Sequence, residues 1–247
     1  MDPGNAEAMD MRLDKALTLL GMTRTEAKKA IAAGRVRVRG EAARDPGLHV
    51  EPAEVSLDGR TPEPPREIYW MLNKPAGVLT ATEDKRGATT ALDLLPEAVR
   101  RRAPGPVGRL DKDVTGLVLM TTDGQLAHRL ISPRWTVEKV YLAETEGALS
   151  EEGAERLRAG VAFKDFTARP AGVRLLPGGQ VELTLTEGKY HEVKRLLAAV
   201  GHPVVRLKRL SIGGVRLDAA LQEGESRPLT EVETARLKAL VDMAEEG

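Results

Sequence analysis

The sequence contains no cysteine. This absence excludes disulfide frameworks, zinc sites built on thiolates and cysteine nucleophiles, and it suits a reducing cytosol. Long apolar runs are absent as well, since none reaches the ~18 to 20 residues that a membrane-spanning helix requires. The start of the chain, MDPGNAEAMDMRL, is acidic and rich in small residues, whereas a secretion signal is basic and then apolar. We therefore expect a cytoplasmic protein that is neither membrane-anchored nor secreted.

An excess of charge of one sign is also lacking, because 37 basic residues balance 37 acidic ones. The average hides two local excesses. Between Met11 and Gly40, eight Lys or Arg residues accompany only two acids, and between Lys189 and Arg209, six accompany a single acid. The charge pattern therefore predicts two positive patches, suited to nucleic acid, on an otherwise neutral body.

Two short helices are predicted where the patterned sequence begins. The 247 residues are enough for one or two domains, and we expect residues 1–10 to form a disordered extension. Leucines then recur at helical spacing over residues 13–20, and Gly21 ends this first helix. Thr23 followed by Glu26 is a capping-box pattern, which opens a second helix.

The segment RVRVRG, residues 35–40, alternates arginine with valine, which is typical of a strand with one buried face. Three guanidinium groups share the other face, those of Arg35, Arg37 and Arg39. Such an array suits a phosphate backbone. A solvated strand edge, kept soluble by its charge, is an equally good interpretation of this segment alone.

The blocks RLDKAL, TRTEAKKAI and GRVRVRG, with closing strands near LHV and EVSLDG, resemble the alpha-L RNA-binding module of a small-subunit ribosomal protein and several RNA-modifying enzymes. The resemblance covers a domain of residues 11–60 and implies that its helix pair and following loop bind structured RNA. The RNA-binding residues that it suggests are Arg12, Arg24, Lys28, Lys29, Arg35, Arg37 and Arg39.

A Pro-rich segment, TPEPPRE at residues 61–67, is typical of a stiff linker. Beyond it, residues 68–247 mix strand-like and helical patterns, so we expect an α+β body. The predicted strands cover residues 68–74, 116–121, 137–144, 172–176 and 180–186, with a further strand in VVRLKRLSI. The predicted helices cover residues 124–131, 151–159 and 191–200.

The stretch GRLDKDVTG places Asp111 at the end of a turn. It imitates the first half of a calcium loop, but position twelve of that loop would be Thr122, which cannot supply the closing bidentate carboxylate. The four histidines lack metal-site spacing, and neither a G-x-S-x-G elbow nor a phosphate loop is present. We therefore expect neither a metal nor a cofactor. Taken alone, an aspartate in a turn is more often a capping or solvated residue than a nucleophile.

The motifs GRLD, NKPAG and TGLVLMTTDG together resemble the signature of the pseudouridine synthases. Three further blocks match in order: SPRWTVEKVYLAE, EGKYHEVKRLLAAVGHPV and RLSIGGVRLDAALQEGESRPLT. One departure is HEV at residues 191–193, where the family has HQV. The order of alpha-L module, linker and catalytic body is that of the branch acting on small-subunit ribosomal RNA.

The resemblance implies a mainly antiparallel catalytic sheet and an isomerase that modifies ribosomal RNA without a cofactor, and we expect a monomer. Two alternatives stay open. One is a pseudouridine synthase acting on large-subunit RNA or tRNA, and the other is a non-catalytic RNA-binding factor in ribosome assembly.

The resemblance makes Asp111 the catalytic residue. It would act as a nucleophile at the anomeric carbon or on the uracil ring, or it would abstract a sugar proton. Each route needs an ionised carboxylate in a site that excludes water, where burial alone penalises charge, so a cation is expected nearby. Lys194 is the candidate, because 100° per residue places it at the border of the apolar stripe of its helix, whereas Arg195 faces solvent or RNA.

The other expected site residues surround this pair. Tyr141 and Lys139 share one face of a strand, where the tyrosine would stack on a flipped uracil or move its proton and the lysine would meet a phosphate. Arg109 would support RNA from which the uridine has been flipped. Lys74 of NKPAG and Arg195 are further candidates for substrate binding. Arg206, Lys208 and Arg209 would follow the RNA backbone, or would be ordinary surface charge.

Overall fold

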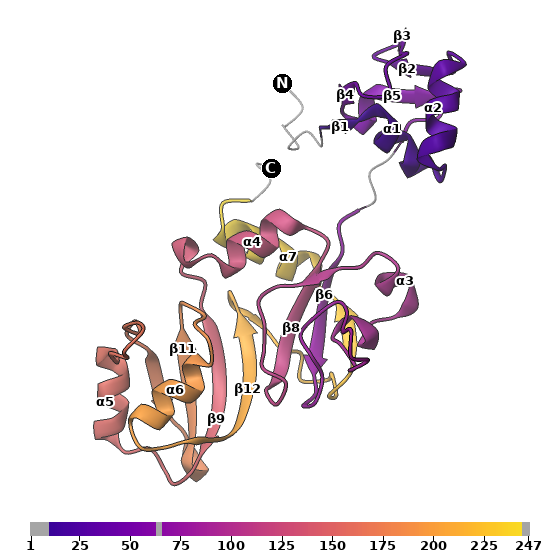
Figure 1. Cartoon of the computed structure of the whole chain (residues 1–247). Coiled ribbons are helices and arrows are strands. Elements are labelled where there is room, and N and C mark those ends of the chain that lie inside the picture. The colour runs from indigo at the N-terminus through magenta and orange to yellow at the C-terminus, as the bar shows by residue number, and fades with distance from the viewer. Residues whose placement is uncertain (1–9, 63–65, 244–247) are drawn as a thin grey trace. The chain divides into compact units, whose positions relative to one another are not determined.

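The computed structural model describes residues 10–62 and 66–243 (Figure 1). This part of the chain forms two compact units, which adjoin in sequence at Arg66 and Glu67. The linker expected at residues 61–67 spans that boundary, although residues 63–65 lie outside the described residues, as do residues 1–9 of the expected extension. Among the described residues, no helix has both the length and the apolar character needed to cross a bilayer.

The first unit combines short helices with two small antiparallel sheets. Its helical segments are α1 (Leu13–Ala16), the 3₁₀ turn η1 (Leu17–Leu20), α2 (Arg24–Ala32) and the 3₁₀ turn η2 (Pro52–Glu54). Its strands are β1 (Met11–Arg12), β2 (Val36–Val38), β3 (Glu41–Ala42), β4 (His49–Val50) and β5 (Val55–Leu57). One sheet has the order β3-β2-β5, and the other pairs β1 with β4.

The helix pair forms for the reasons that the sequence indicates. Gly21 ends η1 with a φ of 85°, a left-handed conformation that favours glycine. The capping box at the start of α2 is confirmed, since the Thr23 amide donates to Glu26 Oε2 at 2.7 Å and the Glu26 amide donates to Thr23 Oγ1 at 3.2 Å. Leu13, Leu17 and other apolar side chains of both helices form the core of this unit.

The second unit holds a larger sheet with helices on both faces. Its strands are β6 (Tyr69–Lys74), β7 (Gly105–Pro106), β8 (Thr115–Thr121), β9 (Lys139–Thr145), β10 (Gly172–Leu175), β11 (Gln180–Leu185), β12 (Val204–Ile212), β13 (Val215–Arg216) and β14 (Ser226–Pro228). Its α-helices are α3 (Glu97–Arg100), α4 (Gly124–Ile131), α5 (Glu151–Ala159), α6 (Glu192–Ala199) and α7 (Glu231–Leu240). Short 3₁₀ turns are η3 (Leu92–Leu94), η4 (Pro133–Trp135) and η5 (Pro177–Gly179).

The main path of the sheet has the order β10-β11-β9-β12-β8-β6-β14, with β13 added to β12 and β7 to β8. Only the β8–β12 pair among the described strands is parallel. The expected α+β fold with a mainly antiparallel sheet is therefore confirmed.

Both faces of this sheet are buried. Along β8, Val118 and Met120 enter one core, whereas Leu117 and Leu119 enter the other. Helices α5 and α6 contribute to the first core, and α4 and α7 to the second. Figure 1 shows α4 and α7 together, and the Arg129 side chain of α4 donates to the Val241 carbonyl just after α7 at 2.9 Å.

Gly116 allows β8 to approach β12 closely. Its φ is 101°, and a Cβ atom at this position would lie only 2.3 Å from the Arg209 carbonyl oxygen. Only glycine fits such a backbone at this distance. The segment before β8 carries Asp111, and the segment before β12 contains α6. The close approach of the two strands therefore helps to place Asp111 beside α6.

The predicted strands and helices are present, with ends that differ by one or two residues. Helix α7 is not among the predicted elements, although Thr230 and Glu233 form a second capping box at its start. The capping pattern was the available signal for this helix.

Candidate active site

The Asp111 loop lies between β7 and β8 and is fixed by a second loop after β6. Thr80 Oγ1 donates to the Leu110 carbonyl at 2.9 Å and accepts from the Leu110 amide at 3.2 Å. The Gly77 amide donates to the carbonyl of Lys112 at 2.8 Å. Backbone groups on both sides of Asp111 are therefore held, which orients its side chain before any substrate binds.

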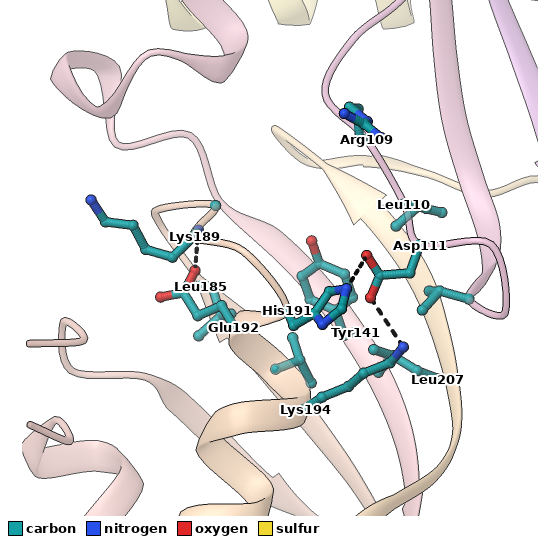
Figure 2. Close-up of a pocket in the computed structure, with 13 residues that line it drawn as sticks. Arg109, Leu110, Asp111, Tyr141, Leu185, Lys189, His191, Glu192, Lys194 and Leu207 are labelled. Carbon is teal, nitrogen blue, oxygen red and sulfur yellow. Dashed lines mark hydrogen bonds and ion pairs between the residues drawn. The ribbon is translucent and has the colours of Figure 1, made fainter. Parts of the chain in front are cut away.

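Asp111 contacts two cation-forming side chains from one segment. Its Oδ2 atom lies 3.0 Å from Lys194 Nζ, and its Oδ1 atom lies 3.3 Å from His191 Nε2 (Figure 2). His191 is the N-cap of α6 and has a left-handed backbone, with φ 52°. The first turn of α6 thereby presents both groups to the same carboxylate. The Asp111 side chain keeps 28% of its surface exposed, so it is accessible at the edge of a partly buried cluster.

Lys194 also binds Asp113, at 2.8 Å to Oδ1 and 2.9 Å to Oδ2. Partial burial works against its charge, but the carboxylates of Asp113 and Asp111 outweigh burial, and the pKa of Lys194 is raised. The hydrogen bond from Lys194 in turn lowers the pKa of Asp113. Lys194 is therefore charged at neutral pH and compensates Asp111, at the position that the helical geometry predicts.

A cavity opens beside this cluster. Apolar walls come from Leu110, Val114, Leu185 and Leu207. Tyr141 of β9 also lines it and is only 9% exposed, whereas Arg109 is exposed at the rim. Figure 2 shows Arg109 on the same segment as Asp111 and away from Lys194. The arrangement offers a carboxylate, an aromatic ring and apolar contacts to one planar group, with a guanidinium outside.

Lys139 does not meet the expectation of a phosphate contact. The prediction that it shares the face of Tyr141 is confirmed, but this face is buried, and Lys139 is only 8% exposed. Its Nζ atom donates to the Val137 carbonyl at 3.0 Å. Burial, together with the charge of Arg209, lowers the pKa of Lys139. The lysine is an internal part of the sheet and cannot reach RNA from this position.

Lys74 is likewise internal, which corrects its assignment to substrate binding. The residue is fully buried, and its Nζ atom donates to the carbonyls of Pro75 at 2.9 Å, Val78 at 2.9 Å and Lys112 at 3.2 Å. Burial lowers the pKa of Lys74 to about 8. The ammonium group thus holds the NKPAG turn against the Asp111 loop, and no donor is left for a ligand.

Arg209 also differs from the expectation of a surface charge. It is 1% exposed, and its Nε atom donates to the Leu117 carbonyl at 2.8 Å. Its neighbours Arg206 and Lys208 lie on the opposite face of β12 and are exposed and half-buried, respectively. Arg206 lies 3.8 Å from Glu144, so the second positive patch is weaker than the sequence indicates.

Arg195 does not face open solvent as predicted, since 29% of its side chain is exposed, against 27% for Lys194. It forms an ion pair with Asp165, with Nη2 at 2.5 Å from Oδ1, and its guanidinium lies 4.5 Å and 4.7 Å from the ring centroids of Phe163 and Phe166. It does not line the cavity beside Asp111. Contact between Arg195 and the substrate stays a prediction.

The seven candidate RNA-binding residues of the first unit are all exposed. Three of them form ion pairs with carboxylates: Arg12 with Asp14, Arg35 with Asp58 and Arg39 with Glu54. Arg37 donates to the Gly40 carbonyl at 3.0 Å. Arg24, Lys28 and Lys29 on α2 form no ion pair with described residues, so α2 carries three of the unit's uncompensated basic residues.

Two acids near the cavity were missed from the sequence. Glu192 is 4% exposed and accepts from the Lys189 amide at 2.8 Å, while Glu187 accepts from the Arg169 amide at 2.7 Å. Burial, followed by a hydrogen bond with Glu187, raises the pKa of Glu192 to about 7. The departure HEV from the family pattern was the available signal. His191, also missed, stands directly before the helix of Lys194.

No cluster of three or more His, Asp or Glu side chains that could hold a metal ion occurs within residues 10–62 and 66–243. Asp111 and Asp113 instead share the ammonium group of Lys194.

Comparisons with known proteins agree with this geometry. Residues 68–199 match the model of the family described as RNA pseudouridylate synthase, and residues 11–56 match that of the S4 domain. An uncharacterised RNA pseudouridine synthase of Bacillus subtilis is 46% identical over 231 residues, which are 90% of this chain and 96% of that protein. The ribosomal small subunit pseudouridine synthase A of Escherichia coli K12 is 45% identical over 91% of this chain and 99% of its own. A crystal structure of a pseudouridylate synthase superposes with a TM-score of 0.66 at 36% identity, covering 92% of this chain and 99% of that one.

Proposed function

Since this chain belongs to the RNA pseudouridylate synthase family, and is thus an isomerase acting on RNA, we propose that its substrate is one specific uridine of small-subunit ribosomal RNA. The likeness to the Escherichia coli protein, whose name specifies the small ribosomal subunit, supports this choice of RNA. The match of the first unit to the S4 domain supports RNA binding. The Asp111–Lys194 pair beside a cavity is the structural observation that carries the assignment of the site.

The reaction is a balanced isomerisation. The bond between uracil N1 and ribose C1′ breaks, the base turns, and a bond forms between C5 and C1′, while C5 loses a proton and N1 gains one. Attack of Asp111 at C1′, attack on the uracil ring and removal of a sugar proton are the three routes open to the carboxylate. All three need its ionised form, which the ammonium group of Lys194 stabilises at 3.0 Å.

The surrounding residues have distinct proposed roles. The uridine must leave the RNA stack to reach Asp111, and the apolar walls with the Tyr141 ring accept its planar base. The hydroxyl of Tyr141 moves the proton that C5 releases. Arg109, exposed at the rim, supports the opened RNA through its planar guanidinium.

RNA outside the cavity is bound by uncompensated charge. Arg24, Lys28 and Lys29 on α2 contact phosphates of structured RNA. Arg206, which Glu144 partly compensates at 3.8 Å, and Lys208 add a second, weaker contact. We further propose that the chain acts as a monomer. A substrate in ribosomal RNA places this action in the cytoplasm.

The choice of RNA is tested by mapping pseudouridines in cells with and without the gene. One position in small-subunit RNA should lose its pseudouridine, and expression of the native protein should restore it. Loss of a pseudouridine from large-subunit RNA or tRNA instead would overturn the assignment of the RNA but keep the enzyme. The same test in vitro incubates the purified protein with a transcript of small-subunit RNA and maps the pseudouridines that form.

The assignment of the site is tested with two neighbouring aspartates. Asp111→Asn should abolish product formation while RNA binding persists, because the variant keeps its shape but loses the nucleophile. Asp113→Asn is the matched control, since it alters a second carboxylate on Lys194 and leaves the Asp111 contact. Full activity of Asp111→Asn would refute the catalytic role of Asp111. If the native protein supports ribosome assembly but forms no pseudouridine, the result would favour a non-catalytic RNA-binding factor.

A further inference from the structure

Tyr190 is an exposed aromatic residue between two residues that line the cavity. Lys189 and His191 both face the cavity, whereas Tyr190 retains 77% of its surface exposed. Its side chain belongs to none of the apolar cores of the described chain. Exposure of a large ring gives up the free energy that its burial would provide, so packing does not account for a tyrosine at this position.

The Tyr190 ring is nevertheless held in place. It stacks on the His191 ring, with centroids 3.7 Å apart and planes inclined by 21°. His191 in turn lies 3.3 Å from Asp111. One face of the tyrosine is therefore covered by a ring bound to the proposed nucleophile, and the exposed surface of Tyr190 leaves the other face open to a ligand.

The bases of RNA next to a flipped uridine are suitable ligands for this open aromatic face. When one uridine is flipped into the cavity, the bases beside it lose a stacking partner. Unstacked bases of RNA bind to aromatic side chains through their planar faces, whichever base they are. Arg109, exposed at the cavity rim, supplies a positive charge for the adjoining phosphates.

We infer that Tyr190 is a stacking platform for the base next to the flipped uridine. The inference rests on the proposed RNA substrate and adds a second base-binding position outside the cavity. This position recognises a base by its planar face. It therefore favours an unpaired neighbouring base over a base paired in a duplex. The position thus selects for the local RNA structure around the uridine more than for the RNA sequence.

The test is a double-mutant cycle between protein and RNA. The RNA is a stem-loop that contains the mapped uridine, made with normal flanking nucleotides or with an abasic nucleotide on the 5′ or the 3′ side. The enzymes are the full-length native chain and Tyr190→Ala. Removal of the stacking base should lower kcat/KM of the native enzyme about 5- to 150-fold, mainly through KM. The same removal should change kcat/KM of Tyr190→Ala by less than about twofold.

Three further variants separate stacking from other effects. Tyr190→Phe should keep the coupling to the base, because it keeps the ring, whereas Tyr190→Leu should lose it. Val232→Ala, at an equally exposed apolar residue on α7, should leave the coupling of the native enzyme unchanged. Thermal unfolding of each variant checks that the exposed substitutions leave the fold intact.

Two RNAs decide the matter, one abasic on the 5′ side of the uridine and one on the 3′ side. The inference is overturned if each of these RNAs affects the native enzyme and Tyr190→Ala equally. Such a result would mean that Tyr190 only supports His191, since a structural role would lower activity whether or not the base is present. If mapping places the uridine in another RNA, the same cycle is carried out with that RNA. Failure of the stacking platform is thus distinguishable from failure of the proposed substrate.

Discussion

The ammonium group of Lys74 donates to the backbone carbonyl of Lys112 at 3.2 Å, although 38 residues separate the two in the chain. The same ammonium group binds the carbonyls of Pro75 and Val78. A fully buried cation therefore joins the turn after β6 to the residue that follows Asp111. Its role is to position the loop that carries Asp111, the proposed catalytic residue.

Lys74→Met should loosen this loop. The substitution leaves buried carbonyls without a donor, which should lower the free energy of unfolding by about 1–3 kcal/mol. A displaced carboxylate should lower kcat by about 10²-fold. Urea unfolding and single-turnover kinetics measure the two effects. Lys112→Met is the control, because its exposed side chain can change while its carbonyl stays in place. Equal kinetics of the two variants would contradict the positioning role.

Lys194→Gln should lower kcat by about 10²- to 10³-fold, a loss comparable to that from removing one charge-stabilising donor of an active site. The reason is that Asp111 loses the cation at 3.0 Å. Lys194→Arg should recover part of the activity, because it restores a positive charge at the same turn of α6. Single-turnover product formation is the measurement.

The control for this pair is Arg195→Gln, which removes a neighbouring cation that binds Asp165 and lies outside the cavity. It should retain far more activity than Lys194→Gln. A loss of equal size in both variants would show that the total charge of α6, rather than the contact with Asp111, is what matters.

Local patterns predicted the elements well because each pattern depends on nearby residues. The capping box at Thr23 and the glycine stop at Gly21 act within a few residues, and the structure contains both. The 100° rotation per residue placed Lys194 where it reaches Asp111. It did not predict that Arg195 would be as buried as Lys194, because the Phe163 and Phe166 rings that cover it come from a distant segment. The assignment of Asp111 required more than one motif and rested on resemblance over nearly the whole chain.

Local sequence patterns could not predict that three cationic side chains are buried inside the sheet. Alternation along a strand shows that Lys139 and Tyr141 share a face, but not whether helices cover it. Lys74 and Arg209 are buried because both faces of the sheet are covered, which depends on the order of distant strands. A lysine or arginine on a strand is usually interpreted as exposed, and here the acceptors are carbonyls that only the tertiary structure brings near.

Gly116→Ala should destabilise the second unit by at least about 3 kcal/mol, since it combines a strained φ with a clash. The added Cβ atom would lie 2.3 Å from the Arg209 carbonyl oxygen, and backbone cannot move aside as a flexible side chain can. Gly124→Ala is the matched control, because no heavy atom lies within 4 Å of its added Cβ atom. Thermal unfolding of both variants measures the difference, and a similar Tm for the two would contradict the close approach of β8 and β12.

Glu192→Gln should remove a pH dependence of stability. Burial and the hydrogen bond with Glu187 raise the pKa of Glu192 in the folded chain to about 7 from a usual value of 4.5. The folded state therefore binds this proton more tightly than the unfolded state does. Its stabilising contribution is complete below pH 4.5 and is lost as the pH rises to about 7.

Urea unfolding at pH 5 and pH 8 measures this contribution. The native chain should lose on the order of 2 kcal/mol between the two conditions through Glu192. Glu192→Gln should lose correspondingly less, since the amide still accepts from the Lys189 amide, donates to Glu187 and carries no charge at either pH. Glu182→Gln on β11 is the control, because Glu182 binds Arg174 at the edge of the sheet and lies apart from this pair. If the free energy of unfolding of Glu192→Gln keeps the pH dependence of the native chain, the proton bound by Glu192 does not contribute to folding stability.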